Sequence, residues 1–168
     1  LALAVGILRL AKSNTLVQDM YSLEMLARVN VLCLDKTGTI TDGRMRVNDT
    51  VILNTIGDAS VNDIMGSMLR ELDNNNQTSI ALYNHFGFSD KYAGIAKIPF
   101  SSKRKLSAVT FDDLGTFAMG APEFVLKPYP AKVERIVKQY AQMGLRVIVL
   151  AHSPAAIVGE KLPSVMKP

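Results

Sequence analysis

The residues best suited to chemistry stand at the end of an apolar run. Residues 29–34 read Val-Asn-Val-Leu-Cys-Leu, a nearly continuous apolar stretch that suits a strand buried on both faces of a parallel sheet. Asp35 follows directly, and ligands of open α/β sheets bind beyond the carboxyl ends of the strands. A carboxylate at that point can attack phosphorus as a nucleophile and form an aspartyl phosphate. The sequence therefore predicts phosphoryl chemistry at Asp35.

The residues that follow Asp35 fit the same chemistry. Gly38 lets the backbone approach a phosphate closely, and Thr37 and Thr39 offer hydroxyl and amide donors to its oxygens. Lys36 adds positive charge, while the carboxylate can help to hold Mg²⁺, which neutralises charge on a transferring phosphoryl group. A lone Asp after a strand is usually incidental. The whole string Asp-Lys-Thr-Gly-Thr-Ile-Thr that begins here is far more specific.

Apart from Ile40, this string resembles the phosphorylation signature of P-type ATPases, Asp-Lys-Thr-Gly-Thr-Leu-Thr. The resemblance implies that Asp35 is the phosphorylated residue and that Lys36 and Thr37 belong to the catalytic site. It also implies that Asp35 and Thr37 hold Mg²⁺, with the remaining ligands outside this chain. The strand at residues 29–34 would then be the first strand of a haloacid-dehalogenase-like phosphorylation domain.

Phosphatases of the haloacid dehalogenase group are an alternative, because their site is similar. They usually place a second Asp two residues after the nucleophile, where it serves as general acid and base. Here that position is Thr37, which cannot do this work at neutral pH. We therefore expect the acyl phosphate to be hydrolysed slowly unless another domain supplies a base, which suits a pump whose phosphoenzyme must survive a conformational change.

Three further segments resemble the nucleotide domain of the same ATPases, in the family's order and spacing. They read Phe-Ser-Ser-Lys-Arg-Lys-Leu-Ser at residues 100–107, Gly-Ala-Pro-Glu at 120–123 and Gly-Leu-Arg-Val at 144–147. The resemblance implies ATP as the ligand. The nucleotide-binding residues that it implies are Phe100, Lys105, Gly120, Ala121 and Arg146.

The residue types agree with nucleotide binding. The Phe100 ring can stack on adenine, and Lys105, which we expect on a strand, can close over the base or reach the phosphates. Arg146 can pair with phosphate oxygens in a fork, and Gly120 allows close backbone approach. Without the family context, Phe100 is better explained as a core aromatic and residues 103–105 as a solvated basic edge.

Two positions depart from the family's pattern. Met119 stands where the family usually has a lysine immediately before Gly-Ala-Pro-Glu, so the pocket loses a positive charge. Ser79 falls near the place of a glutamate that usually reaches the adenine amino group. Both departures predict weak nucleotide binding and a relaxed choice of base.

The apolar spacing predicts a mixed unit of helices and hairpin strands after about residue 47. The resemblance implies an α/β (α+β) architecture there, an antiparallel sheet flanked by helices, beside that first strand of the phosphorylation domain. Helices are expected at residues 1–12, at 21–28, after a Ser60 cap, at 78–86 and around 133–140. Strands are expected at residues 95–99, 105–111, 116–119 and 145–151, with a hairpin turn at 112–115.

The predicted organisation has four parts. They are the stalk end of the fourth membrane helix at 1–28, the start of the phosphorylation domain at 29–46, the nucleotide-binding domain at 47–151, and a linker or truncated return segment at 152–168. The opening residues contain no Met and no polar lead-in, so we expect that a longer protein was cut there. The family's later phosphorylation motifs do not follow residue 151.

Composition narrows the classes of function. Of 168 residues, 48% are hydrophobic and 20% charged, which indicates a globular chain rather than a disordered one. The net charge of +4 is small and scattered and gives no reason to expect a nucleic-acid partner. One cysteine cannot form an internal disulfide, so a reducing compartment is expected. His85 and His152 lack the spacing of a transition-metal site.

The resemblance implies a parent enzyme that hydrolyses ATP through phosphorylated Asp35 and couples this reaction to cation transport. The motifs are closest to the calcium and magnesium branches, so a hard cation of that kind is the expected cargo. The chain would lie at the cytoplasmic face of the cell membrane, joined to it through the parent. By itself it would lack turnover. The alternative from a different class is therefore an isolated nucleotide-binding module.

Overall fold

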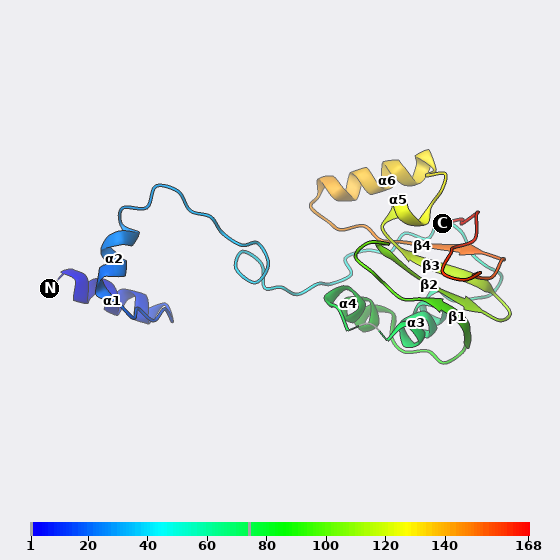
Figure 1. The fold of residues 1–168 in the computed structure, drawn as a ribbon, viewed down its shortest axis with the longest axis horizontal. Coiled ribbons are helices and arrows are strands. Elements are labelled where there is room, and N and C mark those ends of the chain that lie inside the picture. Colours follow the sequence, from blue (N-terminus) through cyan, green and yellow to red (C-terminus); the bar gives the residue numbers. More distant parts are fainter. Residues whose placement is uncertain (1, 74) are drawn as a thin grey trace. The chain divides into compact units, whose positions relative to one another are not determined.

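The computed structural model describes residues 2–73 and 75–168 and divides the chain into two compact units. The first unit ends at Gly43 and the second begins at Arg44. The first contains α1 (Ala2–Lys12) and α2 (Met20–Leu26), both close to the predicted helices, followed by extended chain (Figure 1). Across the described residues, every helix is too short or too polar to cross a bilayer.

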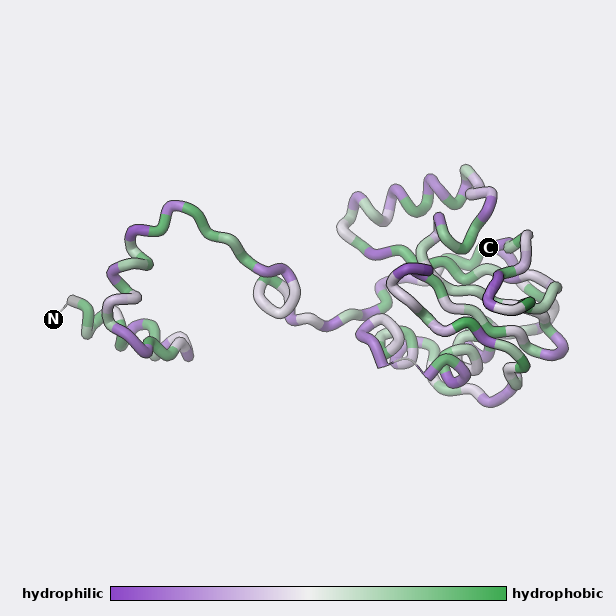
Figure 2. Tube along the Cα trace, in the orientation of Figure 1, coloured by the Kyte–Doolittle hydropathy of each residue, from purple (hydrophilic) through white to green (hydrophobic). Residues whose placement is uncertain are grey.

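The strand predicted at residues 29–34 does not form. The segment is extended and unpaired, and Figure 2 shows it as a hydrophobic stretch of open chain. Val31 and Leu32 are 72% and 71% exposed. A strand buried on both faces belongs to a sheet that is covered on both sides, and the described part of this unit contains no strand that could pair with it. The apolar pattern is that of a core strand, but its sheet is not supplied here.

The second unit is built on a four-stranded antiparallel sheet, as the sequence predicts. The strands are neighbours in chain order: β1 (Gly94–Ile98), β2 (Leu106–Phe111), β3 (Gly115–Gly120) and β4 (Val149–Ser153). The last strand begins four residues later than expected, because residues 145–148 form the connection from the preceding helix.

A tight hairpin joins the two central strands. Phe111 pairs with Gly115, whose φ of 81° suits a glycine far better than any other residue. Thr110 and Thr116, the next pair inward, share a hydrogen bond of 2.8 Å between their buried hydroxyls. These bonds fix the register of the pair and so decide which side chains face each layer of helices.

One face of the sheet is covered by α3 (Val61–Leu72) and α4 (Gln77–Phe86), which Figure 1 shows side by side beneath the strands. Ser60 caps α3 as predicted, accepting a bond from the Asn62 amide, and Asn76 caps α4. The buried side chains of this layer are Ile64, Met65, Met68, Leu69, Leu72, Leu82, Val109, Phe111, Phe117 and Met119.

The opposite face carries α5 (Pro122–Val125) and α6 (Ala131–Gln142). Small residues alternate with the large ones on the strands, and Ala108, Ala118 and Ala151 are almost fully buried on this side. Because these side chains are short, α5 can pack directly on β3 and β4. The sheet is therefore buried between two helical layers.

The chain after β4 folds back on the sheet. Lys167 and His152 exchange two backbone hydrogen bonds of 2.7 and 2.8 Å, and the Met166 side chain is only 7% exposed. These contacts join residues 166–167 to the sheet of the second unit, and the interpretation of residues 152–168 as a linker or a truncated return segment stays a prediction.

The segment at the start of the second unit has no regular structure but is tied to three distant elements. The Tyr140 hydroxyl on α6 donates to the Asp49 carboxylate. Thr50 Oγ1 lies 3.3 Å from His85 Nε2 on α4, and Asn54 donates to the terminal carbonyl group at 2.5 Å. These side-chain bonds hold the segment against the domain, although this part of the described chain forms no β-sheet hydrogen bonds.

The Tyr140–Asp49 bond predicts a pH dependence of stability. The bond lowers the pKa of Asp49 and raises the pKa of Tyr140 from their ordinary values. Its stabilising effect is therefore complete between about pH 5 and 9 and is lost as pH falls through the lowered carboxyl pKa or rises through the raised phenol pKa. We expect Tyr140→Phe to lower the free energy of unfolding most within that window.

Urea unfolding of both proteins at a series of pH values tests this expectation. Tyr83→Phe is a matched control, because Tyr83 is a tyrosine of the same domain that is 46% exposed. A Tyr140→Phe deficit that stays constant from pH 3 to 11 would contradict the assignment.

Candidate functional site

The Asp35 loop is compact and closed on one carbonyl group. The amides of Ile40 and Thr41 both donate to the Lys36 carbonyl oxygen, at 3.1 and 3.0 Å, and Thr41 Oγ1 also reaches it at 3.3 Å. Gly38 has a φ of 82°, and a Cβ there would meet no atom within 4 Å. The glycine is therefore needed for its backbone conformation, and the space beside it is open.

The Asp35 side chain is exposed at the entrance of this loop. Its Oδ1 accepts a long bond of 3.4 Å from the Thr37 amide, which orients the carboxylate locally. No surrounding group within the described residues buries it. The carboxylate is thus accessible to a phosphoryl group, as a nucleophile must be.

The oxygen atoms around Asp35 are of the type that binds Mg²⁺, but they are too few to form a complete site. Carboxylate, hydroxyl and carbonyl oxygens are the ligands that a hard cation prefers, and Asp35 and Thr37 offer them. Among the described residues, however, no three His, Cys, Asp or Glu side chains gather in a group that could hold a metal. These two residues alone do not make a magnesium site.

In the second unit, the predicted nucleotide residues lie at one end of the sheet. Phe100 follows the end of β1 and Lys105 precedes the start of β2. Gly120 ends β3, and Arg146 lies just before β4. Because the strands are antiparallel, Gly120 pairs with the first residue of β2 on one side and the first of β4 on the other. The sheet therefore brings residues from distant parts of the sequence to the same end of its strands.

Phe100 and Lys105, both in the connection between β1 and β2, have different surroundings. The Phe100 ring is 47% exposed, as a stacking platform must be. The Lys105 ammonium lies 5.8 Å from the centre of the Phe124 ring on α5. Lys105 is not on a strand, contrary to the prediction, because its φ of 54° is left-handed and β2 starts one residue later. Phe124 is an aromatic neighbour of Lys105 that lies outside the motifs of the sequence.

Gly120 has a packing role that the motif alone does not reveal. A Cβ at this position would lie 2.4 Å from the Lys105 carbonyl oxygen and 2.7 Å from Leu106 Cα. The same carbonyl group accepts a bond of 3.1 Å from the Ala121 amide, which starts α5. Ala121 and Gly120 therefore hold the Lys105 backbone in place, whatever else binds there.

The remaining positions differ in their exposure. Arg146 is exposed on the connection between α6 and β4, so its guanidinium can reach a ligand. Met119 is 7% exposed and belongs to the core beneath the sheet. Ser79 is 6% exposed and both its amide and its hydroxyl bond to the Asn76 side chain. The two departures from the family's pattern are thus buried positions, one apolar and one committed to a helix cap.

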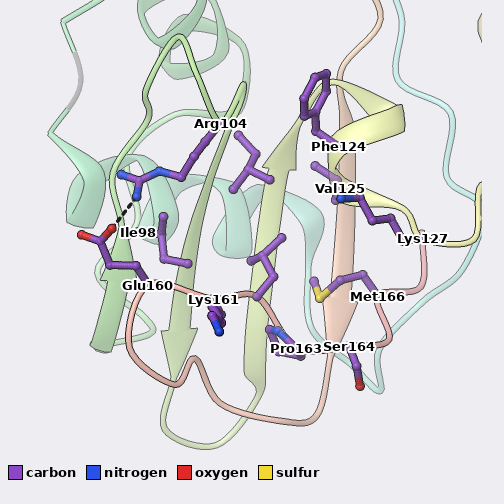
Figure 3. A pocket seen from close by; sticks show the side chains of 12 residues that line it. Ile98, Arg104, Phe124, Val125, Lys127, Glu160, Lys161, Pro163, Ser164 and Met166 are labelled. Carbon is purple, nitrogen blue, oxygen red and sulfur yellow. Dashed lines mark hydrogen bonds and ion pairs between the residues drawn. The ribbon is translucent and has the colours of Figure 1, made fainter.

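A pocket of about 330 Å³ lies on the α5 side of the sheet (Figure 3). The predicted nucleotide residues do not line it. Arg104, Lys127 and Lys161 supply its positive charges, Glu160 its negative charge, and its apolar lining consists of Ile98, Leu106, Phe124, Val125, Leu162, Pro163 and Met166. The pocket therefore adjoins the candidate loop through Arg104 without being the predicted site.

Comparison with known proteins gives consistent relatives. No protein-family model matches the chain. A probable cation-transporting ATPase of Streptococcus pneumoniae is 39% identical over 153 residues, which is 90% of this chain and 19% of the relative. The calcium-transporting ATPase CtpE of Mycobacterium tuberculosis is 35% identical over 169 residues, covering 100% of this chain and 21% of the relative. The plasma membrane ATPase of Neurospora crassa is 29% identical over 174 residues, 89% of this chain and 19% of the relative. The chain thus spans about a fifth of the length of these relatives.

The packing role of Gly120 can be measured. Gly120→Ala should lower the free energy of unfolding by about 1–3 kcal/mol, because the added methyl group must displace the backbone of Lys105 and Leu106. Gly159→Ala is the control, since its Cβ would meet open space and only its φ of 62° opposes it, a cost of about 1 kcal/mol. Urea unfolding that shows no greater loss at Gly120 than at Gly159 would contradict this role.

Proposed function

This chain is a segment of a P-type ATPase, homologous to about a fifth of several cation-transporting members, and we propose that it carries their phosphorylation site and nucleotide-binding region. The complete protein would hydrolyse ATP through an aspartyl phosphate and use the free energy to move a cation across a membrane. The observation that carries the proposal is the string from Asp35 to Thr41, folded as an exposed loop with an accessible carboxylate.

Asp35 is the proposed nucleophile. A carboxylate oxygen attacks the γ-phosphorus, the bond from that phosphorus to the β–γ bridging oxygen breaks, and ADP leaves with the electron pair. The acyl phosphate is later cleaved by water, which releases inorganic phosphate and restores the carboxylate. Mg²⁺, when bound, supplies charge neutralisation at the phosphoryl group. The Lys36 ammonium adds positive charge beside the carboxylate, and the Thr37 amide orients one of its oxygens.

The second unit is the proposed nucleotide carrier. The exposed Phe100 ring offers a face for adenine, and Arg146 offers a forked pair of donors for phosphate oxygens. Lys105 contributes positive charge at the same end of the sheet, while Gly120 and Ala121 hold its backbone. The buried positions of Met119 and Ser79 support weak binding, because neither presents a polar group to a ligand.

The cargo and the location are proposed from the relatives. One relative is named a calcium-transporting ATPase and another a probable cation-transporting ATPase. We therefore favour calcium or a similar hard cation. The described residues hold no membrane-spanning helix, and a segment that binds ATP would work at the cytoplasmic face of the membrane.

Two other functions compete with this proposal. A phosphatase of the haloacid dehalogenase group would need a general acid and base where Thr37 stands, and a threonine hydroxyl does not titrate near neutral pH. The second alternative is that this chain on its own is a nucleotide-binding module without turnover. Release of phosphate from ATP by this chain would argue against that description.

The nucleotide site predicts a measurable affinity. ATP should bind this chain with a dissociation constant of about 0.1–3 mM, and Phe100→Ala should cost about 1–3 kcal/mol of that affinity by removing the stacking face. Phe88→Ala is the matched control, because Phe88 is 60% exposed on a different loop. An NMR titration reports both the affinity and the residues that shift. Equal affinity of the wild type and Phe100→Ala would show that the site has been placed wrongly.

A further inference from the structure

The connection between β1 and β2 carries two of the proposed nucleotide ligands, Phe100 and Lys105. Its backbone is closed by the Lys105 amide, which donates to the Ser101 carbonyl oxygen at 2.8 Å. The Arg104 amide donates to Ser101 Oγ at 3.1 Å. Lys105 takes up a left-handed backbone conformation, which a residue other than glycine adopts only where its surroundings hold it. The directions of both ligands therefore depend on what fixes this connection.

The Arg104 side chain spans the connection from its last turn to its beginning. Its Nη2 donates to the Pro99 carbonyl oxygen at 3.4 Å, and its Nη1 donates to Glu160 Oε2 at 2.8 Å. Figure 3 shows the Arg104 guanidinium bonded to Glu160, which lies in the segment that follows β4. One side chain thus links the start of the connection, its end and the segment that follows β4.

Stability does not account for this arrangement. The Glu160 carboxylate is 82% exposed and the Arg104 side chain 32% exposed, and an ion pair this open to water adds little to stability. Arg104 Nε is buried without a hydrogen-bond partner among the described residues, which is a cost. What the side chain does supply is a fixed geometry for residues 99–105.

We propose that Arg104 is a positioning residue for the nucleotide, an inference that rests on the proposed nucleotide site. Arg104 lines the pocket on the α5 side of the sheet and is not one of the proposed ligands. By bonding Pro99 and Glu160 it holds the Phe100 ring and the Lys105 side chain where base and phosphate meet them. Glu160 shares this role through Arg104.

The test compares ATP and adenosine binding to the whole chain by NMR titration. Arg104→Ala should weaken adenosine about 3- to 10-fold, because misplacing the stacking face affects the base, and should weaken ATP by at least that factor, because Lys105 is misplaced as well. Lys103→Ala is the matched control, since it removes one positive charge from the same connection. It should change ATP affinity less than about 2-fold and leave adenosine unchanged.

Two more variants separate positioning from other roles. Arg104→Lys keeps the charge but has one nitrogen where Arg104 uses two separate nitrogens for Glu160 and Pro99, so it should restore only part of the affinity. Glu160→Gln, at an exposed position that does not threaten folding, should weaken both ligands less than Arg104→Ala does. In each affected variant the amide shifts before ligand is added should centre on residues 99–105.

Four results would overturn the inference, and they differ from failure of the nucleotide site itself. The first is unchanged affinity in Arg104→Ala, and the second is a loss confined to ATP, which would make Arg104 a phosphate ligand. The third is full restoration of affinity by Arg104→Lys. The fourth is a loss in Lys103→Ala equal to that in Arg104→Ala. If the wild-type chain does not bind ATP at all, the proposed nucleotide site is wrong, and the role proposed for Arg104 is wrong with it.

Discussion

The antiparallel pairing of β2 with β3 is the constraint on which the rest of the second unit depends. It places Leu106 opposite Gly120 with so little room that any side chain at Gly120 would collide with the Lys105 backbone. The same register puts the large residues Phe111 and Phe117 toward α3 and the small residue Ala118 toward α5. One set of ladder bonds thus decides both the core and the position of the candidate ligands.

Residues far apart in the sequence meet at one end of the sheet because of this pairing. The ends of β1 and β3 and the starts of β2 and β4 lie at the same end of the sheet, so the connections at that end carry the exposed Phe100 ring and the basic side chains of Lys105 and Arg146. The sheet is buried between helices, and the candidate ligands lie at the ends of its strands. This arrangement is common for binding sites, since a packed scaffold positions residues on loops.

Much of this fold could be predicted from local patterns. The hairpin at residues 112–115 is signalled by its turn residues, and α3 by the Ser60 cap and its apolar spacing. The strand at 29–34 could not be confirmed, because apolar composition identifies a core strand but not its partners. Motifs also indicated which residues could meet a nucleotide. They could not indicate the packing role of Gly120, the contact of Lys105 with Phe124, or the bond from Arg104 to Glu160, since each depends on tertiary contacts.

We propose that Asp35 accepts a phosphoryl group from ATP in the full-length protein. The most direct measurement is covalent labelling of the full-length protein with ATP radiolabelled in its γ-phosphate, followed by acid quench and peptide mapping. We expect a hydroxylamine-sensitive label on the peptide that contains Asp35, with no label in Asp35→Asn. A label that persists in Asp35→Asn, or that maps to a different peptide in the wild type, would contradict it.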